Sequence, residues 1–125
     1  MFLNNMPKLS SNQLQEYNDN GYVAPIEVLT KDEAFKIRKE IENIETKWPD
    51  ELKGAGRNYV HMISPILDEV CHNSKMLDAV ESIIGKNILI CGTTLFIKNP
   101  YEKGFVSFHQ DATYIGLEPH NWVTA

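Results

Sequence analysis

The sequence predicts a single α+β domain in which helices come first and strands follow. Up to about Gly85 the apolar residues recur at helical spacing, whereas from Ile88 onward short runs of β-branched and aromatic residues replace them. The chain has 125 residues, enough for one hydrophobic core but not for two. No repeat or Gly/Ser/Pro-rich linker divides it. We therefore expect one domain over 1–125, mainly helical over 1–85 and strand-forming over 86–125.

Two helices are expected at the ends of the helical part. The first covers residues 11–18, with Ser10 or Ser11 as its N-cap. The last covers residues 74–84, where apolar residues fall on one side. The residues expected to face inward from this last helix are Leu77, Val80, Ile83 and Ile84.

The helix between these two has the clearest start. Thr30 and Glu33 form a capping box, in which the threonine hydroxyl accepts a backbone N–H and the glutamate accepts the N–H of the cap residue. The helix should continue to about Lys47. Its apolar stripe, spaced four, three and four residues apart, consists of Ile37, Ile41, Ile44 and Trp48. A stripe of this kind should be buried against the rest of the domain.

The second part of the chain is expected to form strands. Residues 87–97 and 104–108 are two strand candidates, joined by a turn that contains Pro100. A third extended piece covers 121–125. Because a sheet of three strands is barely stable by itself, we expect the chain to be the front part of a longer protein.

Composition and charge exclude several classes of function. The net charge is −5, so a nucleic acid partner is not expected. No stretch approaches the roughly 20 apolar residues that span a bilayer, so no membrane association is expected either. Cys71 and Cys91 are too far apart for a redox or zinc pair, and we expect both to be small buried residues. The sequence thus predicts a cytoplasmic protein.

The triplet His109-Gln110-Asp111 is the main chemical motif. At the end of an extended segment, side chains two residues apart lie on the same face, so the imidazole and the carboxylate can bind one ion. These are two of the three ligands of the facial triad in non-haem iron(II) oxygenases. The alternative is a histidine held by a local hydrogen bond at a strand end.

The context of this triplet resembles the phytanoyl-CoA dioxygenase family of iron(II)- and 2-oxoglutarate-dependent oxygenases. The most specific similarity runs from Phe96 to Asp111, and weaker similarity extends over nearly the whole chain. The segments that carry it are Gln13–Tyr17, Gly21–Val23, Leu29–Thr30, Ile83–Gly85, Leu95–Pro100, Phe108–Asp111, Tyr114, Pro119 and Trp122–Ala125.

This resemblance implies a double-stranded β-helix, or jelly roll, with helices packed on its first strands and only part of the fold in this chain. It implies an iron(II) site of His109, Asp111 and a more distal histidine, with 2-oxoglutarate as cosubstrate and an arginine on a later strand to bind it. His120 lies in a turn and is not assigned as the third ligand. Thr94 matches a cosubstrate-contacting position of the family. Strand alternation places Lys98 on the same face as Thr94, so we expect Lys98 to supply charge to the cosubstrate pocket, the alternative being a solvated lysine at a strand end.

Three further residues are weaker candidates. His61 lies in a region where family members place cosubstrate or substrate contacts, and Tyr114 is either a pocket residue or a packing residue. His72 follows Asp68 by four residues, which is typical of an ordinary pair on a helix surface.

Three functions therefore remain open. The leading hypothesis is a dioxygenase that uses dioxygen to hydroxylate a small organic substrate. Hydroxylation is expected rather than halogenation, because the carboxylate of Asp111 leaves no ligand position on the iron for a halide. The first alternative is a non-catalytic, truncated or diverged jelly-roll protein that serves in binding or interaction. The second is an unrelated α+β binding module in which the triplet is coincidental.

Overall fold

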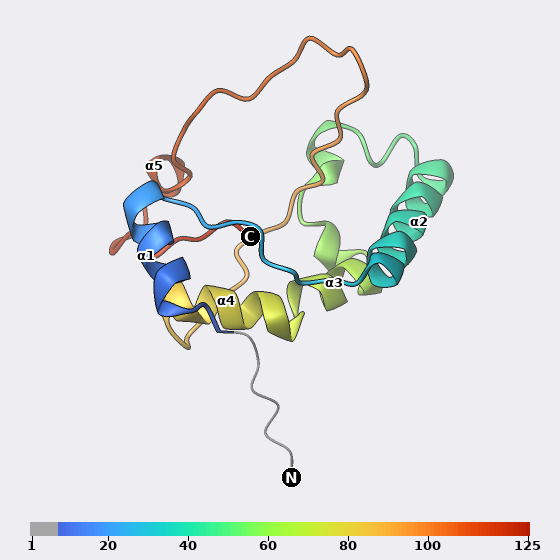
Figure 1. Ribbon diagram of the computed structural model, residues 1–125. Helices are drawn as coiled ribbons and strands as arrows, with labels where there is room; N and C mark the ends of the chain where they lie inside the picture. The colour runs from blue at the N-terminus through green and yellow to red at the C-terminus, as the bar shows by residue number, and fades with distance from the viewer. Residues whose placement is uncertain (1–7) are drawn as a thin grey trace.

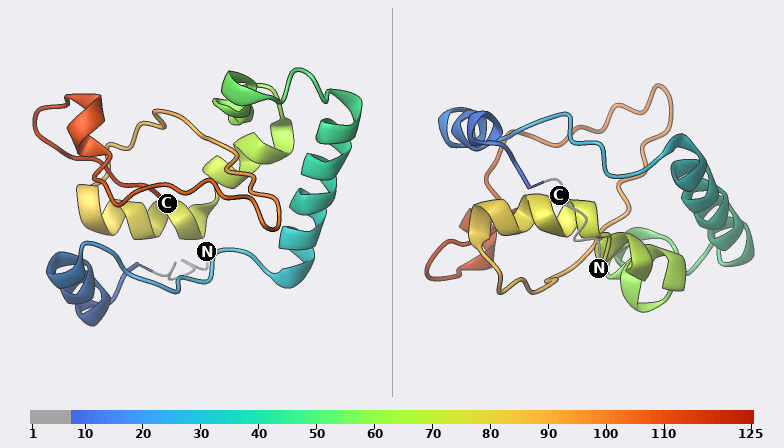
Figure 2. Two further views of the ribbon diagram at one scale, coloured as in Figure 1. Left: turned by 90° about the horizontal axis from the view of Figure 1, so that it is seen from above. Right: turned by 60° about the horizontal axis from the view of Figure 1, so that its bottom comes forward.

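The computed structural model describes residues 8–125, and Figure 1 shows their arrangement. Helices α1 and α2 lie at opposite ends of the molecule, and α4 and α3 run between them (Figures 1 and 2). None of the helices in the described part of the chain is long and apolar enough to cross a membrane. The helices are α1 (Ser11–Asn20), α2 (Lys31–Lys47), η1 (Gly54–Arg57), η2 (Val60–Met62), α3 (Pro65–Cys71), α4 (Ser74–Ile84) and α5 (Ala112–Ile115).

The three expected helices are confirmed, and their ends follow local capping chemistry. Helix α1 continues two residues further than expected and ends where Gly21 adopts a left-handed conformation with φ of 79°. Helix α2 begins with the expected capping box: the Thr30 N–H donates to Glu33 Oε2 at 2.7 Å, and the Glu33 N–H donates to Thr30 Oγ1 at 3.3 Å. The short helix α5 was not expected, and α3 was indicated only by the helical spacing of Asp68 and His72. Pro65 occupies a favourable first position in α3.

The capping box makes a testable contribution to stability. Thr30→Ala removes the side-chain acceptor for the Glu33 N–H and should lower the free energy of unfolding by about 1 kcal/mol, measured by urea denaturation. The hydrogen bond from the Thr30 N–H lowers the pKa of Glu33 below its ordinary 4.5. The contribution of Glu33 is therefore complete at pH 7 and decreases as the pH falls through the folded-state pKa.

Thr46→Ala is the matched control for this substitution. Thr46 lies in the last turn of the same helix, where its hydroxyl donates back to the carbonyl of Glu42 at 2.8 Å. Such a bond does not support the helix, and alanine is the better helix former, so this variant should be neutral or slightly more stable. Equal losses in the two variants would contradict the capping argument.

A small core lies where α2, η2 and α3 meet. Its buried members are Leu52, Val60 and Leu67. Three stripe residues of α2, together with Ile66 and Leu95, pack against them; the stripe residues are Ile37, Ile41 and Ile44. The expected burial of Trp48 is wrong, since its side chain is 55% exposed. Trp48 is the C-cap of α2, and its φ of −131° takes it out of the helical stripe.

The strands expected at 87–97, 104–108 and 121–125 are not formed in the described part of the chain. The β part of the expected α+β fold is therefore absent from the described residues, because a strand requires a neighbouring strand to pair with. Residues 86–110 run mainly as an extended segment that arches away from the helices (Figure 1). The side chain of Phe108 on this arch is fully exposed.

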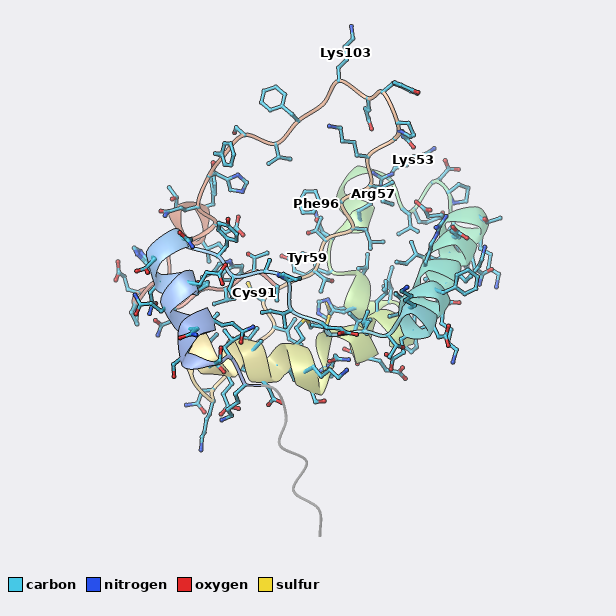
Figure 3. The ribbon with its side chains drawn as sticks, in the orientation of Figure 1. Lys53, Arg57, Tyr59, Cys91, Phe96 and Lys103 are labelled. Atoms are coloured by element: carbon cyan, nitrogen blue, oxygen red, sulfur yellow. The ribbon has the colours of Figure 1, made fainter. Side chains whose placement is uncertain are left out.

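Within residues 8–125, one short backbone pairing holds the start of this segment. An isolated antiparallel bridge joins Asn58 to Thr94. The Tyr59 N–H donates to the Thr93 carbonyl at 2.6 Å, and the Leu95 N–H donates to the Arg57 carbonyl at 3.0 Å. Figure 3 shows Arg57, Tyr59 and Phe96 in this region and Lys103 at the far tip of the arch.

The two cysteines differ in their surroundings. Cys71 is buried as expected, and burial raises the pKa of its thiol. The expectation for Cys91 is wrong, because it lies on the extended segment and is exposed. That segment has too few packed neighbours to cover a side chain of this size.

Candidate metal centre

His109 and Asp111 meet where the extended segment enters α5. His109 Nε2 lies 3.1 Å from Asp111 Oδ1, and both side chains are a little over one third exposed. The alternation of side chains along a strand predicted that both groups lie on one strand face. In the structure they do not lie on a strand. Asp111 has helical backbone angles, φ −58° and ψ −37°, at the N-cap of α5, so a turn rather than a strand brings the side chains together.

The imidazole of His109 is oriented by the backbone. Its Nδ1 lies 2.7 Å from the carbonyl oxygen of Ser107. A carbonyl can only accept a hydrogen bond, so Nδ1 carries the hydrogen and donates it. Nε2 then has two states: it is protonated and donates to Asp111, or its lone pair and the carboxylate oxygen point together at a cation. Histidines that bind metals through Nε2 have this same arrangement at Nδ1.

The second carboxylate oxygen of Asp111 is bound from the C-terminal segment. Thr124 Oγ1 donates to Asp111 Oδ2 at 2.5 Å, and Trp122 Nε1 donates to Thr124 Oγ1 at 3.3 Å. The hydrogen bond from Thr124 is the main reason that the pKa of Asp111 lies below its ordinary value. The carboxylate is therefore ionised at neutral pH, the state that a metal ligand requires.

The pKa of His109 is shifted in the opposite direction. The hydrogen bond to the Ser107 carbonyl raises it, and the Asp111 carboxylate raises it further. The edge of the Tyr114 ring packs on the imidazole, with the ring centres 5.8 Å apart. The imidazole is thus fixed on three sides, by a carbonyl, a carboxylate and an aromatic ring.

The spacing of the two donor atoms fits a metal ion. Two adjacent ligands on an octahedral metal, each with a bond of about 2.1 Å, are about 3.0 Å apart. The observed separation of Nε2 and Oδ1 is 3.1 Å. Within residues 8–125, no third histidine, cysteine, aspartate or glutamate joins the pair to form a three-ligand group.

The pair lies at the wall of a large open groove of about 850 Å³. Helices α1 and α4, the connection after α1 and the C-terminal segment form the rest of the wall. Apolar side chains of α4 face the groove, and Asp111 is the only side-chain carboxylate among the described residues that line it. The apolar lining from α4 is Met76, Ala79, Val80 and Ile83.

Comparison with known families decides the relationship. Residues 17–125 match the model of the phytanoyl-CoA dioxygenase family. The chain belongs to this family. No curated protein and no solved structure matches the chain. Membership of the phytanoyl-CoA dioxygenase family agrees with the resemblance seen in the sequence and covers both residues of the candidate metal centre.

The two residues expected to contact the cosubstrate, Thr94 and Lys98, lie away from this groove. Thr94 is exposed and donates to Asn58 Oδ1 at 2.9 Å as part of the isolated bridge. Lys98 is exposed on the extended segment. Neither lines the groove that contains His109 and Asp111. Their cosubstrate role therefore stays a prediction.

The weaker candidates take different places. His61 packs on the bridge region, with Nδ1 2.8 Å from Thr93 Oγ1. His72 forms the expected helix-surface pair with Asp68 at 3.4 Å. His120 lines the groove, but its Nε2 lies 3.4 Å from Glu118 Oε1 and does not face His109 and Asp111.

Sequence reasoning did not assign a role to Trp122 and Thr124. Both residues belong to the segment Trp122–Ala125, which resembles the family. Their spacing of two residues in an extended segment places both side chains on one side. That pattern could have indicated that this segment faces the His109–Asp111 pair.

Proposed function

We propose that this chain carries the iron-binding part of an iron(II)- and 2-oxoglutarate-dependent dioxygenase that hydroxylates a small organic substrate, within a longer jelly-roll protein. The observation that carries the proposal is the pair of donor atoms, His109 Nε2 and Asp111 Oδ1, 3.1 Å apart at the wall of the groove. Family membership over residues 17–125 supports the reaction class.

The bound metal with 2-oxoglutarate would supply the chemistry: one atom of dioxygen enters a substrate C–H bond, the other enters succinate, and carbon dioxide is released. The residues of this chain prepare the site for it. His109 provides a neutral nitrogen donor because Ser107 holds the hydrogen on Nδ1. Asp111 provides an anionic oxygen. The apolar face of α4 offers a water-poor wall for the substrate.

The remaining parts of the proposal rest on the sequence analysis. Thr94 and Lys98 are proposed to contact 2-oxoglutarate once later strands complete the jelly roll, and residues 1–125 are proposed to be the first part of that single domain. We propose a cytoplasmic protein with no nucleic acid partner, since the net charge of −5 repels a polyanion.

A non-catalytic binding protein is the second candidate function. It is favoured by the lack of a third ligand among residues 8–125. In that case the 3.1 Å contact is an ion pair between a protonated His109 and Asp111, and no metal is needed.

Iron(II) titration under anaerobic conditions distinguishes the two functions. For the dioxygenase we expect 2-oxoglutarate to tighten iron(II) binding on the order of 10-fold, because the cosubstrate and the two side chains bind the same ion. Isothermal titration calorimetry with and without 2-oxoglutarate measures this coupling. Iron uptake that is weak, lost on mild chelation and unchanged by 2-oxoglutarate would support the non-catalytic protein instead.

A further inference from the structure

A chain of hydrogen bonds connects the C-terminal segment to the candidate metal ligand. Trp122 Nε1 lies 3.3 Å from Thr124 Oγ1, which lies 2.5 Å from Asp111 Oδ2. Thr124 follows Asp111 by 13 residues, so this contact joins two separate segments of the chain. Trp122 and Thr124 also line the groove that contains His109 and Asp111.

The chemistry of the three groups gives this chain of bonds one direction. An indole N–H can only donate, so Thr124 Oγ1 must be the acceptor in the bond from Trp122. The hydroxyl has a single hydrogen, which is then directed at the ionised carboxylate, a group that can only accept. The indole thus orients the hydroxyl, and the hydroxyl orients the carboxylate.

Orientation matters because a carboxylate rotates easily about its last torsion angle. Free rotation would exchange Oδ1 and Oδ2 and would also allow both oxygens to face one ion. With Oδ2 held by Thr124, only Oδ1 is turned toward His109 Nε2, at 3.1 Å. The site is therefore prepared for single-oxygen binding by Asp111.

We propose that Thr124 and Trp122 are positioning residues that hold Asp111 as a single-oxygen metal ligand. The inference rests on the proposed function, in which His109 and Asp111 bind iron(II). Outer groups of this kind typically change metal affinity by about 10- to 100-fold when they are removed. Thr124 acts directly on the carboxylate, whereas Trp122 donates to Thr124 and lies close enough to the carboxylate to support it as well.

Cobalt(II) titration of the full 125-residue chain, followed by visible absorption, tests this role. Thr124→Val keeps the shape of the side chain but removes the hydroxyl, and it should weaken cobalt(II) binding about 10-fold. Thr124→Ser keeps the hydroxyl and should restore binding to within about 3-fold of the original chain. Trp122→Phe should cause a smaller loss than Thr124→Val.

Thr113→Val is the matched control. Thr113 lies in α5, two residues from Asp111, and its side chain makes no hydrogen bond to the other described residues. This variant should bind cobalt(II) like the original chain. Because Thr124 is exposed, circular dichroism should show unchanged thermal unfolding for both valine variants.

Three results would overturn the inference in different ways. If Thr124→Val binds cobalt(II) as tightly as the original chain while His109→Ala does not bind, the positioning role is wrong and the metal site stands. If the original chain binds no better than His109→Ala, the proposed function fails and the positioning role fails with it. If Thr124→Val is unstable, equal affinities of Trp122→Phe and the original chain would also contradict the relay.

Discussion

His109→Ala is expected to reduce cobalt(II) and iron(II) binding by at least about 100-fold, to the level of nonspecific binding, because loss of a ligand exceeds the typical effect of losing an outer group. The imidazole supplies the nitrogen that lies 3.1 Å from Asp111 Oδ1 and could share a metal ion with it. Visible absorption of cobalt(II) or anaerobic calorimetry with iron(II) measures the loss. Binding should also strengthen as the pH rises, since a proton and the metal compete for Nε2.

His72→Ala is the control for this substitution. His72 also lies close to an aspartate, with Nδ1 3.4 Å from Asp68 Oδ1, but the pair is on a helix surface and does not line the groove that contains His109 and Asp111. Its Nδ1 also contacts the Asp68 carbonyl at 2.9 Å. This variant should bind metal like the original chain. A similar loss in both variants would mean that the metal binds to surface histidines in general, and it would remove the basis of the dioxygenase proposal.

The helical half of the fold was predictable because its determinants are local. The capping box of Thr30 and Glu33, together with an apolar repeat, marks α2 within the sequence itself. Trp48 shows the limit of this reasoning. It continues the repeat by spacing, yet it lies one residue beyond the helix, where the backbone turns away.

The strand half was less predictable because strands depend on distant partners. The residues at 87–97 and 104–108 have the composition of strands, but pairing partners decide whether strands form. In the described structure only Asn58 pairs with Thr94. The same dependence explains why Cys91, expected to be buried, is exposed.

The sequence predicted the two candidate ligands of the site but not the groups that orient them. The two-residue spacing of His109 and Asp111 is visible in the sequence, although a turn rather than a strand brings them together. The contact from Thr124 spans 13 residues and depends on where the C-terminal segment runs. The Ser107 carbonyl is a backbone group, which every residue has, so no sequence pattern identifies it.

Leu67→Ala is expected to lower the free energy of unfolding by 2–5 kcal/mol, the typical range for removing a buried leucine side chain. Leu67 is 8% exposed and packs with Leu52 and Val60. Because a domain of this size is stabilised by roughly 5–15 kcal/mol, a loss in this range removes a large part of its total stability. The midpoint of urea denaturation, followed by circular dichroism, measures the change.

Leu89→Ala makes the same chemical change at a site without packing. Leu89 is 89% exposed on the extended segment, so its removal should change the free energy of unfolding by less than about 0.5 kcal/mol. The core around Leu67 already contains a small cavity of about 10 Å³, and truncation of Leu67 would enlarge it. The neighbouring side chains cannot move in to fill the space, because they are held on three different elements, α2, η2 and α3. Equal effects at Leu67 and Leu89 would contradict the core assignment, since burial is the difference between the two sites.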